Sequence, residues 1–191
     1  MQTAVARRRV LMSSDQIERT VARMAHQIVE PEDVQTGILL IGIRRGGEAL
    51  ARRLASKIGE IRGTVPDLGF LNINLYRDDD VARELPESEI RSGITGQTVI
   101  LVDDVLYTGR TIRAALDAVT DLGRPTAIRL AVLIDRGLRE LPIQGDYVGR
   151  VIPTSRREHI DVALAPQRSD ADAVTVSLEE DRAAEEDRAA S

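Results

Sequence analysis

The stretch Val99-Ile100-Leu101-Val102-Asp103-Asp104-Val105-Leu106-Tyr107-Thr108-Gly109-Arg110-Thr111 decides the fold of this chain. Its four leading apolar residues predict a buried strand, and Gly109 between hydroxyl residues predicts a tight turn into a helix. Backbone N–H groups of residues 108–111 at the positive helix end can then bind phosphate, while Asp103 and Asp104 can accept hydrogen bonds from sugar hydroxyls. The stretch therefore predicts a sugar-phosphate site at the carboxyl edge of an α/β sheet.

Other parts of the chain repeat the order of strand, loop and helix. Residues 37–43 form a continuous apolar run, and a helical pattern with one apolar side begins after Arg44-Arg45-Gly46-Gly47. We also expect strands over residues 70–75, 127–134 and 147–151, helices over 13–30 and 111–121, and a terminal hairpin over 161–165 and 174–178. This alternation predicts a mostly parallel sheet with helices on both faces, and the late strands predict a small hood over its carboxyl edge.

The composition fits one domain with a substantial core, since 42% of the 191 residues are hydrophobic. The absence of cysteine excludes disulfides and thiolate metal sites. No apolar run has membrane-spanning length, so we expect a cytoplasmic protein without a membrane partner. Residues 179–191 hold six acidic residues and two arginines, which predicts a disordered tail after a single domain over residues 1–178. The hood would comprise residues 136–178 and the N-terminal helix.

Two other nucleotide-binding folds fit the sequence less well. A strand that ends in two acidic residues also occurs in P-loop nucleotidases, but their loop needs the pattern Gly-x-x-x-x-Gly-Lys-Ser/Thr. Lys57 is the only lysine of the chain, and it follows Ser56 within a helical pattern. Residues 42–47 do not have the Gly-x-Gly-x-x-Gly order of dinucleotide-binding folds.

Residues 99–111 resemble the phosphoribosyl pyrophosphate (PRPP) signature of type I phosphoribosyltransferases: a hydrophobic strand, Asp-Asp and a Thr-Gly-x-Thr turn. The resemblance implies the type I phosphoribosyltransferase fold and a Mg²⁺ ion that Asp103 and Asp104 hold indirectly, through PRPP. It also implies a pyrophosphate-binding loop at Arg44 and Arg45, in which threonine is common at the position of Arg44. The PRPP site would comprise Asp103, Asp104, Tyr107, Thr108, Gly109, Arg110, Thr111, Arg44 and Arg45.

A long polar segment, residues 76–96, has no convincing period. A loop of this length in a compact domain is usually functional or disordered. A lid that closes over the reacting ribose would exclude water from it. Family resemblance gives Arg77 a contact with pyrophosphate when such a lid closes.

Residues 130–142 and 146–155 resemble the PyrR family of pyrimidine operon attenuators, which also have uracil phosphoribosyltransferase activity. Leu75-Tyr76-Arg77-Asp78-Asp79 and the Leu-Tyr-Thr-Gly-Arg-Thr form of the signature extend the resemblance over residues 10–178. In that family the hood and the backbone after a Val-Gly-basic turn recognise the edge of uracil. The resemblance therefore implies a uracil site that comprises Asp135, Arg136, Val151 and Ile152.

The same family binds RNA through basic and polar residues, which His26, Arg139 and Arg150 match here. Other positions differ, because Ala22 replaces a hydroxyl residue, Leu138 replaces histidine and Gln144 replaces arginine. Each of these changes weakens contacts to RNA. With only four aromatic residues in the chain, base stacking would depend on arginine planes.

From these residues we expect an enzyme that joins uracil to PRPP and releases UMP and pyrophosphate. Asp103, Asp104, Arg45 and Arg77 would act by placement and electrostatic stabilisation. We also expect a homo-oligomer, dimer or tetramer, and a UMP-responsive regulator that binds the leader mRNA of pyrimidine genes. The alternatives are a regulator with little enzymatic role, a transferase that has lost RNA binding, and a purine enzyme, which the segment Asp135-Arg136-Gly137 disfavours.

Overall fold

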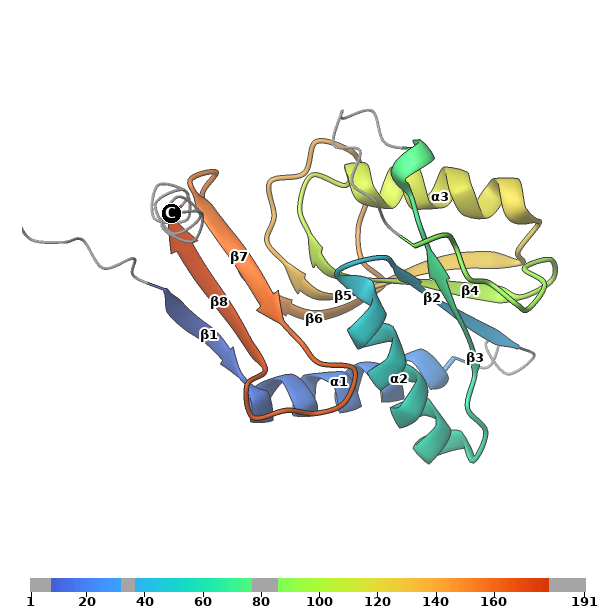
Figure 1. Cartoon of the computed structure of the whole chain (residues 1–191), viewed down its shortest axis with the longest axis horizontal. Coiled ribbons are helices and arrows are strands. Elements are labelled where there is room, and N and C mark those ends of the chain that lie inside the picture. The colour runs from blue at the N-terminus through green and yellow to red at the C-terminus, as the bar shows by residue number, and fades with distance from the viewer. Residues whose placement is uncertain (1–7, 32–36, 77–85, 179–191) are drawn as a thin grey trace, which may run out of the picture.

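The computed structural model of the chain describes residues 8–31, 37–76 and 86–178. Its centre is a five-stranded sheet in the order β3-β2-β4-β5-β6 (Figure 1). The strands are β2 (Ile38–Ile43), β3 (Asp67–Leu71), β4 (Thr98–Leu106), β5 (Ala127–Asp135) and β6 (Tyr147–Val151). Every neighbouring pair in this sheet is parallel, so the carboxyl ends of all five strands lie at one edge. The predicted α/β architecture is therefore confirmed.

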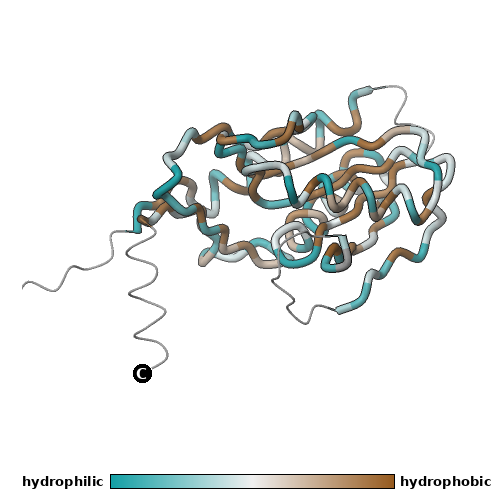
Figure 2. Tube along the Cα trace, turned by 90° about the horizontal axis from the view of Figure 1, so that it is seen from above, coloured by the Kyte–Doolittle hydropathy of each residue, from teal (hydrophilic) through white to brown (hydrophobic). Residues whose placement is uncertain are grey.

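Helices cover both faces of the sheet, which explains why its strands are apolar along most of their length (Figures 1 and 2). Helices α1 (Ser14–Val29) and α2 (Gly47–Arg62) cover one face, and α3 (Arg110–Leu122) covers the other. Side chains of β4 alternate between the two cores, because successive residues of a strand point to opposite faces. Ile100 and Val102 pack with α1 and α2, whereas Val99 and Leu101 pack with α3.

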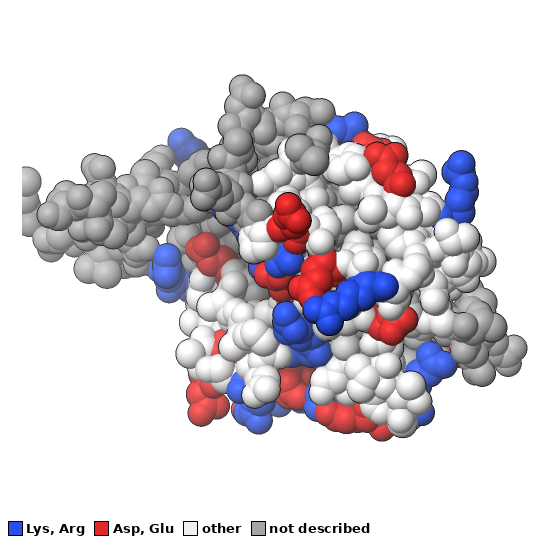
Figure 3. All heavy atoms as spheres, turned by 45° about the vertical axis from the view of Figure 1, so that its right-hand side comes forward, with Lys and Arg blue, Asp and Glu red and all other residues white. Residues whose placement is uncertain are grey.

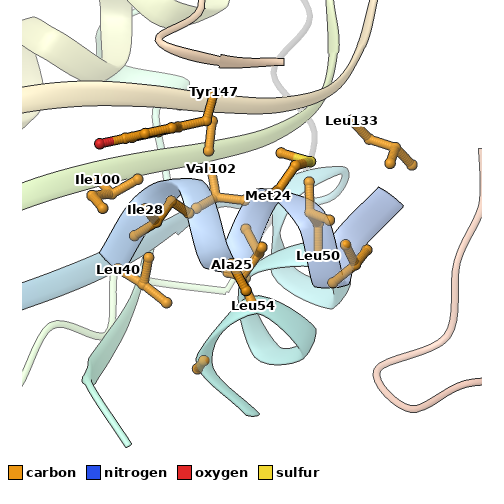
Figure 4. Close-up of a cluster of buried hydrophobic side chains, with 14 of the residues drawn as sticks. Met24, Ala25, Ile28, Leu40, Leu50, Leu54, Ile100, Val102, Leu133 and Tyr147 are labelled. Atoms are coloured by element: carbon orange, nitrogen blue, oxygen red, sulfur yellow. The ribbon is translucent and has the colours of Figure 1, made fainter. Parts of the chain in front are cut away.

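The core between α1, α2 and the sheet is close-packed (Figure 4). Met24 and Ile28 of α1 meet Leu50 and Leu54 of α2, and all four side chains are fully buried. The helix α1 begins with a capping box, as its sequence predicts. The Ser13 hydroxyl accepts from the Gln16 N–H, and the Gln16 side chain accepts from the Ser13 N–H at 2.9 Å.

A second, antiparallel sheet in the order β1-β8-β7 stands beside the first (Figure 1). Its strands are β1 (Arg9–Ser13), β7 (Glu158–Ala163) and β8 (Ala173–Leu178). The hairpin of the hood is thus present, although β7 begins three residues before the predicted position. The sequence did not predict β1, whose five residues add a third strand.

The second strand of the main sheet was predicted over residues 70–75, but β3 ends at Leu71 and a 3₁₀ turn, η2, occupies Asn74–Tyr76. The reason is a local side-chain hydrogen bond. The Asn72 Oδ1 accepts from the Asn74 N–H at 2.9 Å, which turns the chain out of the sheet. The prediction was wrong because it treated this stretch only as an apolar alternation.

Candidate functional site

The loops after β2 and β4 meet at the carboxyl edge of the sheet, as the sequence predicts. Their contact is so close that only glycine fits at two positions of the first loop. A methyl group on Gly46 would overlap the Asp104 carboxylate, and one on Gly47 would overlap the Val102 carbonyl oxygen. The segment Arg44–Gly47 therefore lies directly against the end of β4, and the two predicted anion-binding loops form one site.

Two adjacent carboxylates, Asp103 and Asp104, follow the apolar residues of β4. Asp103 is 6% exposed, and its Oδ1 accepts from the Asp104 N–H at 3.0 Å. Burial raises the pKa of the Asp104 carboxyl, against the opposing effect of backbone hydrogen bonds and of His159 on β7. A carboxylate that has lost this much water gains from a ligand that supplies hydroxyl donors or a positive charge.

The turn after β4 has the geometry of a phosphate cradle. Gly109 is the N-cap of α3 and has a φ of 94°, a conformation that L residues rarely adopt. The first N–H groups of a helix have no partner within it, and they lie here beside the hydroxyls of Thr108 and Thr111. The N–H groups of Glu140 and Leu141 donate to the Thr108 carbonyl oxygen at 3.0 and 3.1 Å and fix the turn from outside. The Arg110 N–H donates to the Thr108 hydroxyl at 3.4 Å, and the Arg110 side chain pairs with Glu140 at 2.9 Å, so the Arg110 guanidinium is engaged outside the turn.

The two arginines of the loop after β2 have different surroundings. Arg44 is half-buried, and it donates from Nε to the Glu87 carbonyl oxygen at 3.0 Å and from Nη1 to Glu48 at 2.6 Å. Arg45 is exposed and has a φ of 81°, which is a strained conformation for a non-glycine residue. Its guanidinium is therefore the more available of the two for a ligand. Arg77, the predicted lid residue, lies outside the described residues.

The candidate uracil residues lie where the neighbouring strands β5 and β6 end. The Ile152 N–H donates to the Asp135 carbonyl oxygen at 2.8 Å, and the Asp135 carboxylate pairs with Arg139 at 2.5 Å. Val151 is 64% exposed. These contacts hold Asp135 and Ile152 in place by bonds within the chain, and they leave the Val151 side chain accessible.

Arg136 is 5% exposed and joins the turn after β4 to the hood. Its guanidinium lies over the Tyr107 ring, 4.2 Å from the centroid. Nε donates to the Thr154 hydroxyl at 2.9 Å, and Nη2 donates to the carbonyl oxygens of Ser155 and Glu158 at 3.0 and 2.5 Å. Arg136 thus sets the distance between the PRPP signature and the hood segment that follows β6.

The three candidate RNA-binding residues come from three different parts of the chain. His26 is exposed on α1, and Arg150 is exposed on β6, where it donates to the Leu11 carbonyl oxygen at 3.0 Å. Arg139 is half-buried beside the turn after β4. Its guanidinium donates to the carbonyl oxygens of Ile143 and Tyr107 at 2.8 and 2.9 Å.

A groove of about 420 Å³ between α1 and β6 contains basic residues that sequence reasoning missed. It is lined by Met12, Gln16, Arg19, Thr20, Arg23, Gly149 and Arg150. The signal was present in the spacing, because residues 19, 23 and 26 follow one another on one face of a helix. On the face drawn in Figure 3, in contrast, acidic and basic side chains are mixed with uncharged surface between them.

Among residues 8–31, 37–76 and 86–178, no group of three or more His, Cys, Asp or Glu side chains could hold a metal ion. In the same part of the chain, no helix combines the length and the apolar character that crossing a membrane requires.

Comparison with known proteins agrees with this geometry. Residues 11–167 match the family model described as "Phosphoribosyl transferase domain". The chain is similar to Bifunctional protein PyrR of Pelotomaculum thermopropionicum, with 49% identity over 173 residues, 88% of this chain and 94% of that protein. It is equally similar to Bifunctional protein PyrR of Corynebacterium glutamicum, with 49% identity over 180 residues, 89% of this chain and 92% of that protein.

Solved structures show the same fold at lower identity. A hypoxanthine phosphoribosyltransferase from Staphylococcus aureus superposes with a TM-score of 0.63 at 20% identity, over 81% of this chain and 85% of that chain. A hypoxanthine-guanine phosphoribosyltransferase from Bacillus anthracis gives 0.63 at 24% identity, over 88% and 96%. Together with the site on β4, the matches confirm the predicted family: this chain belongs to the type I phosphoribosyltransferases and, among them, to the bifunctional PyrR proteins.

Proposed function

We propose that this protein transfers the phosphoribosyl group of PRPP to uracil, giving UMP and pyrophosphate, and that it also regulates pyrimidine genes by binding RNA in response to uridine nucleotides. The observation that carries the catalytic part is the contact of two anion-binding loops beside the buried carboxylate of Asp103 and the half-buried carboxylate of Asp104. PRPP bears a phosphate and a diphosphate on one ribose. A site that offers two anion-binding loops on either side of a sugar-binding acid pair fits this donor.

In this proposal the 5′-phosphate occupies the cradle of residues 108–111, where helix N–H groups and hydroxyls favour negative charge. Asp103 and Asp104 accept hydrogen bonds from the ribose hydroxyls. Mg²⁺ prefers oxygen ligands and keeps several waters, so the two carboxylates fit an ion that PRPP itself carries. When bound, the ion neutralises charge that develops on the diphosphate.

The remaining proposed roles concern the charges on the ribose and the diphosphate and the binding of uracil. Breaking the bond at the anomeric carbon leaves positive charge on the ribose, beside the Asp104 carboxylate, and negative charge on the leaving diphosphate. We propose that Arg45, which is exposed, and Arg77 hold that diphosphate. Uracil binds between the signature turn and the segment of Val151 and Ile152, with Asp135 and Arg136 fixing that segment. No side-chain nucleophile is needed, because placement and charge account for the reaction.

Relatives at about half identity favour uracil over a purine, because they are named Bifunctional protein PyrR. The hypoxanthine enzymes support the fold alone. For the regulatory part, we propose that the groove between α1 and β6 binds RNA phosphates through Arg19, Arg23 and Arg150, and that His26, which follows Arg23 by three residues on α1, contributes to the same surface. We further propose that residues 1–178 form one domain and that the protein assembles as a dimer or tetramer.

The catalytic proposal is tested with Asp104→Asn. We expect UMP synthesis from uracil and PRPP to fall about 100-fold or more, since the amide cannot stabilise positive charge on the ribose. Asp117→Asn, at an exposed carboxylate on α3, is the matched control and should keep full activity. An unchanged rate for Asp104→Asn, with circular dichroism showing an intact fold, would exclude the carboxylate from the mechanism. Hypoxanthine in place of uracil should give no product.

The regulatory proposal is tested by binding a pyrimidine-leader hairpin at several salt concentrations, with and without UMP. We expect UMP to strengthen binding. Arg19→Gln should weaken binding and lower the slope of log K against log salt by about 1, because one phosphate contact is lost. Arg91→Gln, at an arginine that is paired with Glu89 and is remote from the groove in sequence, should leave the slope unchanged. Binding that ignores both UMP and Arg19 would refute this half of the proposal.

A further inference from the structure

A second groove, of about 790 Å³, lies on the outer surface of α2. It is bounded by α2, the start of β3 and the loop that joins β7 to β8, which reaches across α1 toward α2 (Figure 1). Neither the Asp-Asp turn nor the loop after β2 contributes to its lining. It is therefore separate from the proposed PRPP site, and the proposed transferase reaction gives its lining residues no role.

Basic residues outnumber acidic ones in this groove. Four arginine or lysine side chains line it, and Glu18 of α1 is the one carboxylate among its lining residues. Arg168 pairs with Asp15 at 2.5 Å. Arg52 has no carboxylate partner among the described residues, and its guanidinium lies 4.4 Å from the centroid of the Phe70 ring. One cation of the groove is thus uncompensated.

Arg53 supplies a second, independent observation. Its side chain is 4% exposed, so its donors have lost contact with water. Nε and Nη2 donate to the carbonyl oxygens of Ala165 and Gln167 at 2.9 and 2.8 Å, and Nη2 also pairs with Asp172. Nη1 is buried without a hydrogen-bond acceptor. The carboxylate oxygen of Glu18 stops 3.9 Å away, too far for a hydrogen bond.

The Glu18 carboxylate lies between Arg53 and Lys57 of α2 but satisfies only one of these two cations. Its other oxygen lies 3.1 Å from Lys57 Nζ, and hydrogen bonds to Glu18 and Glu60 raise the pKa of Lys57, which keeps this amine charged. The Glu18 carboxylate pairs with Lys57 but leaves Arg53 Nη1 without a hydrogen-bond acceptor, whereas a tetrahedral phosphate offers oxygens in more directions. Arg52 and Ser56 are four residues apart on the helix, and so are Arg53 and Lys57, so the four side chains can close around one group.

From this we propose that the groove on α2 binds the phosphate group of a phosphorylated small molecule, which displaces Glu18 and is held by Arg52, Arg53, Ser56 and Lys57. The neighbouring apolar side chains of Val65 and Leu68 leave room for the rest of the molecule. Glu18 belongs to α1 and is next to Arg19. Displacement of Glu18 by a ligand would therefore change contacts of the helix that carries the proposed RNA-binding arginines. The proposal does not depend on the catalytic one.

Lys57 makes a direct test possible because it is the only lysine of the chain. Reductive ¹³C-methylation keeps its charge and gives one lysine NMR signal besides that of the terminal amine. We expect this signal to shift saturably when inorganic phosphate or UMP is added, and to shift less with sodium chloride at equal ionic strength. Tighter binding of UMP than of phosphate would indicate that the apolar side chains of Val65 and Leu68 contribute to affinity.

Arg52→Gln combined with Ser56→Ala removes two exposed groups outside the proposed catalytic site. It should weaken the phosphate-induced shift about 10-fold and leave UMP synthesis unchanged. Asp104→Asn should abolish UMP synthesis and leave the Lys57 shift intact, so failure of one proposal is distinct from failure of the other. A Lys57 signal that phosphate does not move, or that moves equally in the double variant, would overturn the proposal. So would sedimentation showing that the double variant changes only the oligomeric state, since a second copy would then cover the groove.

Discussion

The carboxyl edge of the five-stranded sheet and the hood beside it, taken here as β1, β7, β8 and their flanking loops without α1, are held by different sets of contacts. At the sheet edge, backbone and small residues meet directly, as where Gly47 fits against the Val102 carbonyl. In the hood, Ile160 and Val174 join the hydrophobic core, and the buried side chains of Arg53 and Arg136 also donate hydrogen bonds to its carbonyl oxygens. Close backbone contact therefore positions the turn after β4, whereas the hood adds buried charged side chains to its apolar contacts.

This difference suits the two regions to different tasks. Close backbone contact leaves the acid pair and the phosphate cradle little freedom, which preorganises the site for charge development. Arginine contacts can break and form again without unfolding the core. We therefore expect the hood to open locally before the main sheet does.

The strongest test of the contrast is Arg53→Met. It leaves the buried Asp172 carboxylate without its cation, so we expect a loss of roughly 3–5 kcal/mol in the free energy of unfolding. Hydrogen exchange should rise first in the loop between β7 and β8, with little change in β2 and β4. Adding Asp172→Asn removes the unpaired charge and should recover part of the loss. Uniform exchange across both sheets would show that the hood and the core unfold as one unit.

Gly47→Ala should act on the opposite region. Its methyl group would overlap the Val102 carbonyl oxygen, and overpacking against backbone should cost about 3 kcal/mol of stability. Chemical denaturation measures this loss. Gly93→Ala is the matched control, because a methyl group there meets nothing within 4 Å. Equal stability of the two variants would mean that the loop after β2 is not held against β4.

Acid should loosen the hood through Asp172. Burial raises the pKa of this carboxyl, but hydrogen bonds from the N–H groups of Ala165 and Ser169 and from Arg53 outweigh it, so the pKa lies below its ordinary value. A carboxyl with a lowered folded-state pKa stabilises the protein above the pKa of about 3.9 that it has when unfolded, and this contribution disappears as the pH falls further. Thermal unfolding between pH 3 and 6 should show a shallower acid decline in Asp172→Asn than in the parent. Parallel curves would remove Asp172 from the acid response.

The same contrast explains how far the sequence could be interpreted. Strand β4 and the turn at Gly109 were predictable, because a continuous apolar run needs cover on both faces and a left-handed turn needs glycine. The roles of Arg53 and Arg136 were not, since each depends on carbonyl oxygens far along the chain. Ser177 of β8 is likewise buried, and nothing in its local pattern indicates β1 beside it.

For the candidate site, the sequence predicted which loops lie at the sheet edge. It did not predict which groups each arginine side chain contacts. Arg139 matched a family RNA-binding position, yet its guanidinium is engaged with carbonyl oxygens near the signature turn. Arg19 and Arg23 were overlooked although their spacing with His26 marks one helix face. Spacing along a helix is a local property and can be predicted, but the partner of an arginine across the fold requires the three-dimensional structure.

The smallest effect is expected at Ser13, where β1 of the hood passes into α1 of the core. Its hydroxyl accepts from the Gln16 N–H and completes the capping box, so Ser13→Ala should cost about 1 kcal/mol. Because the capped helix packs on the main sheet, chemical denaturation should shift without selective exchange in β7 and β8. Ser56→Ala, at an exposed position within α2, controls for the loss of a hydroxyl and should change stability by less. If Ser13→Ala instead raised hydrogen exchange in β7 and β8 first, the start of α1 would unfold together with the hood. The boundary between the two regions would then lie within α1.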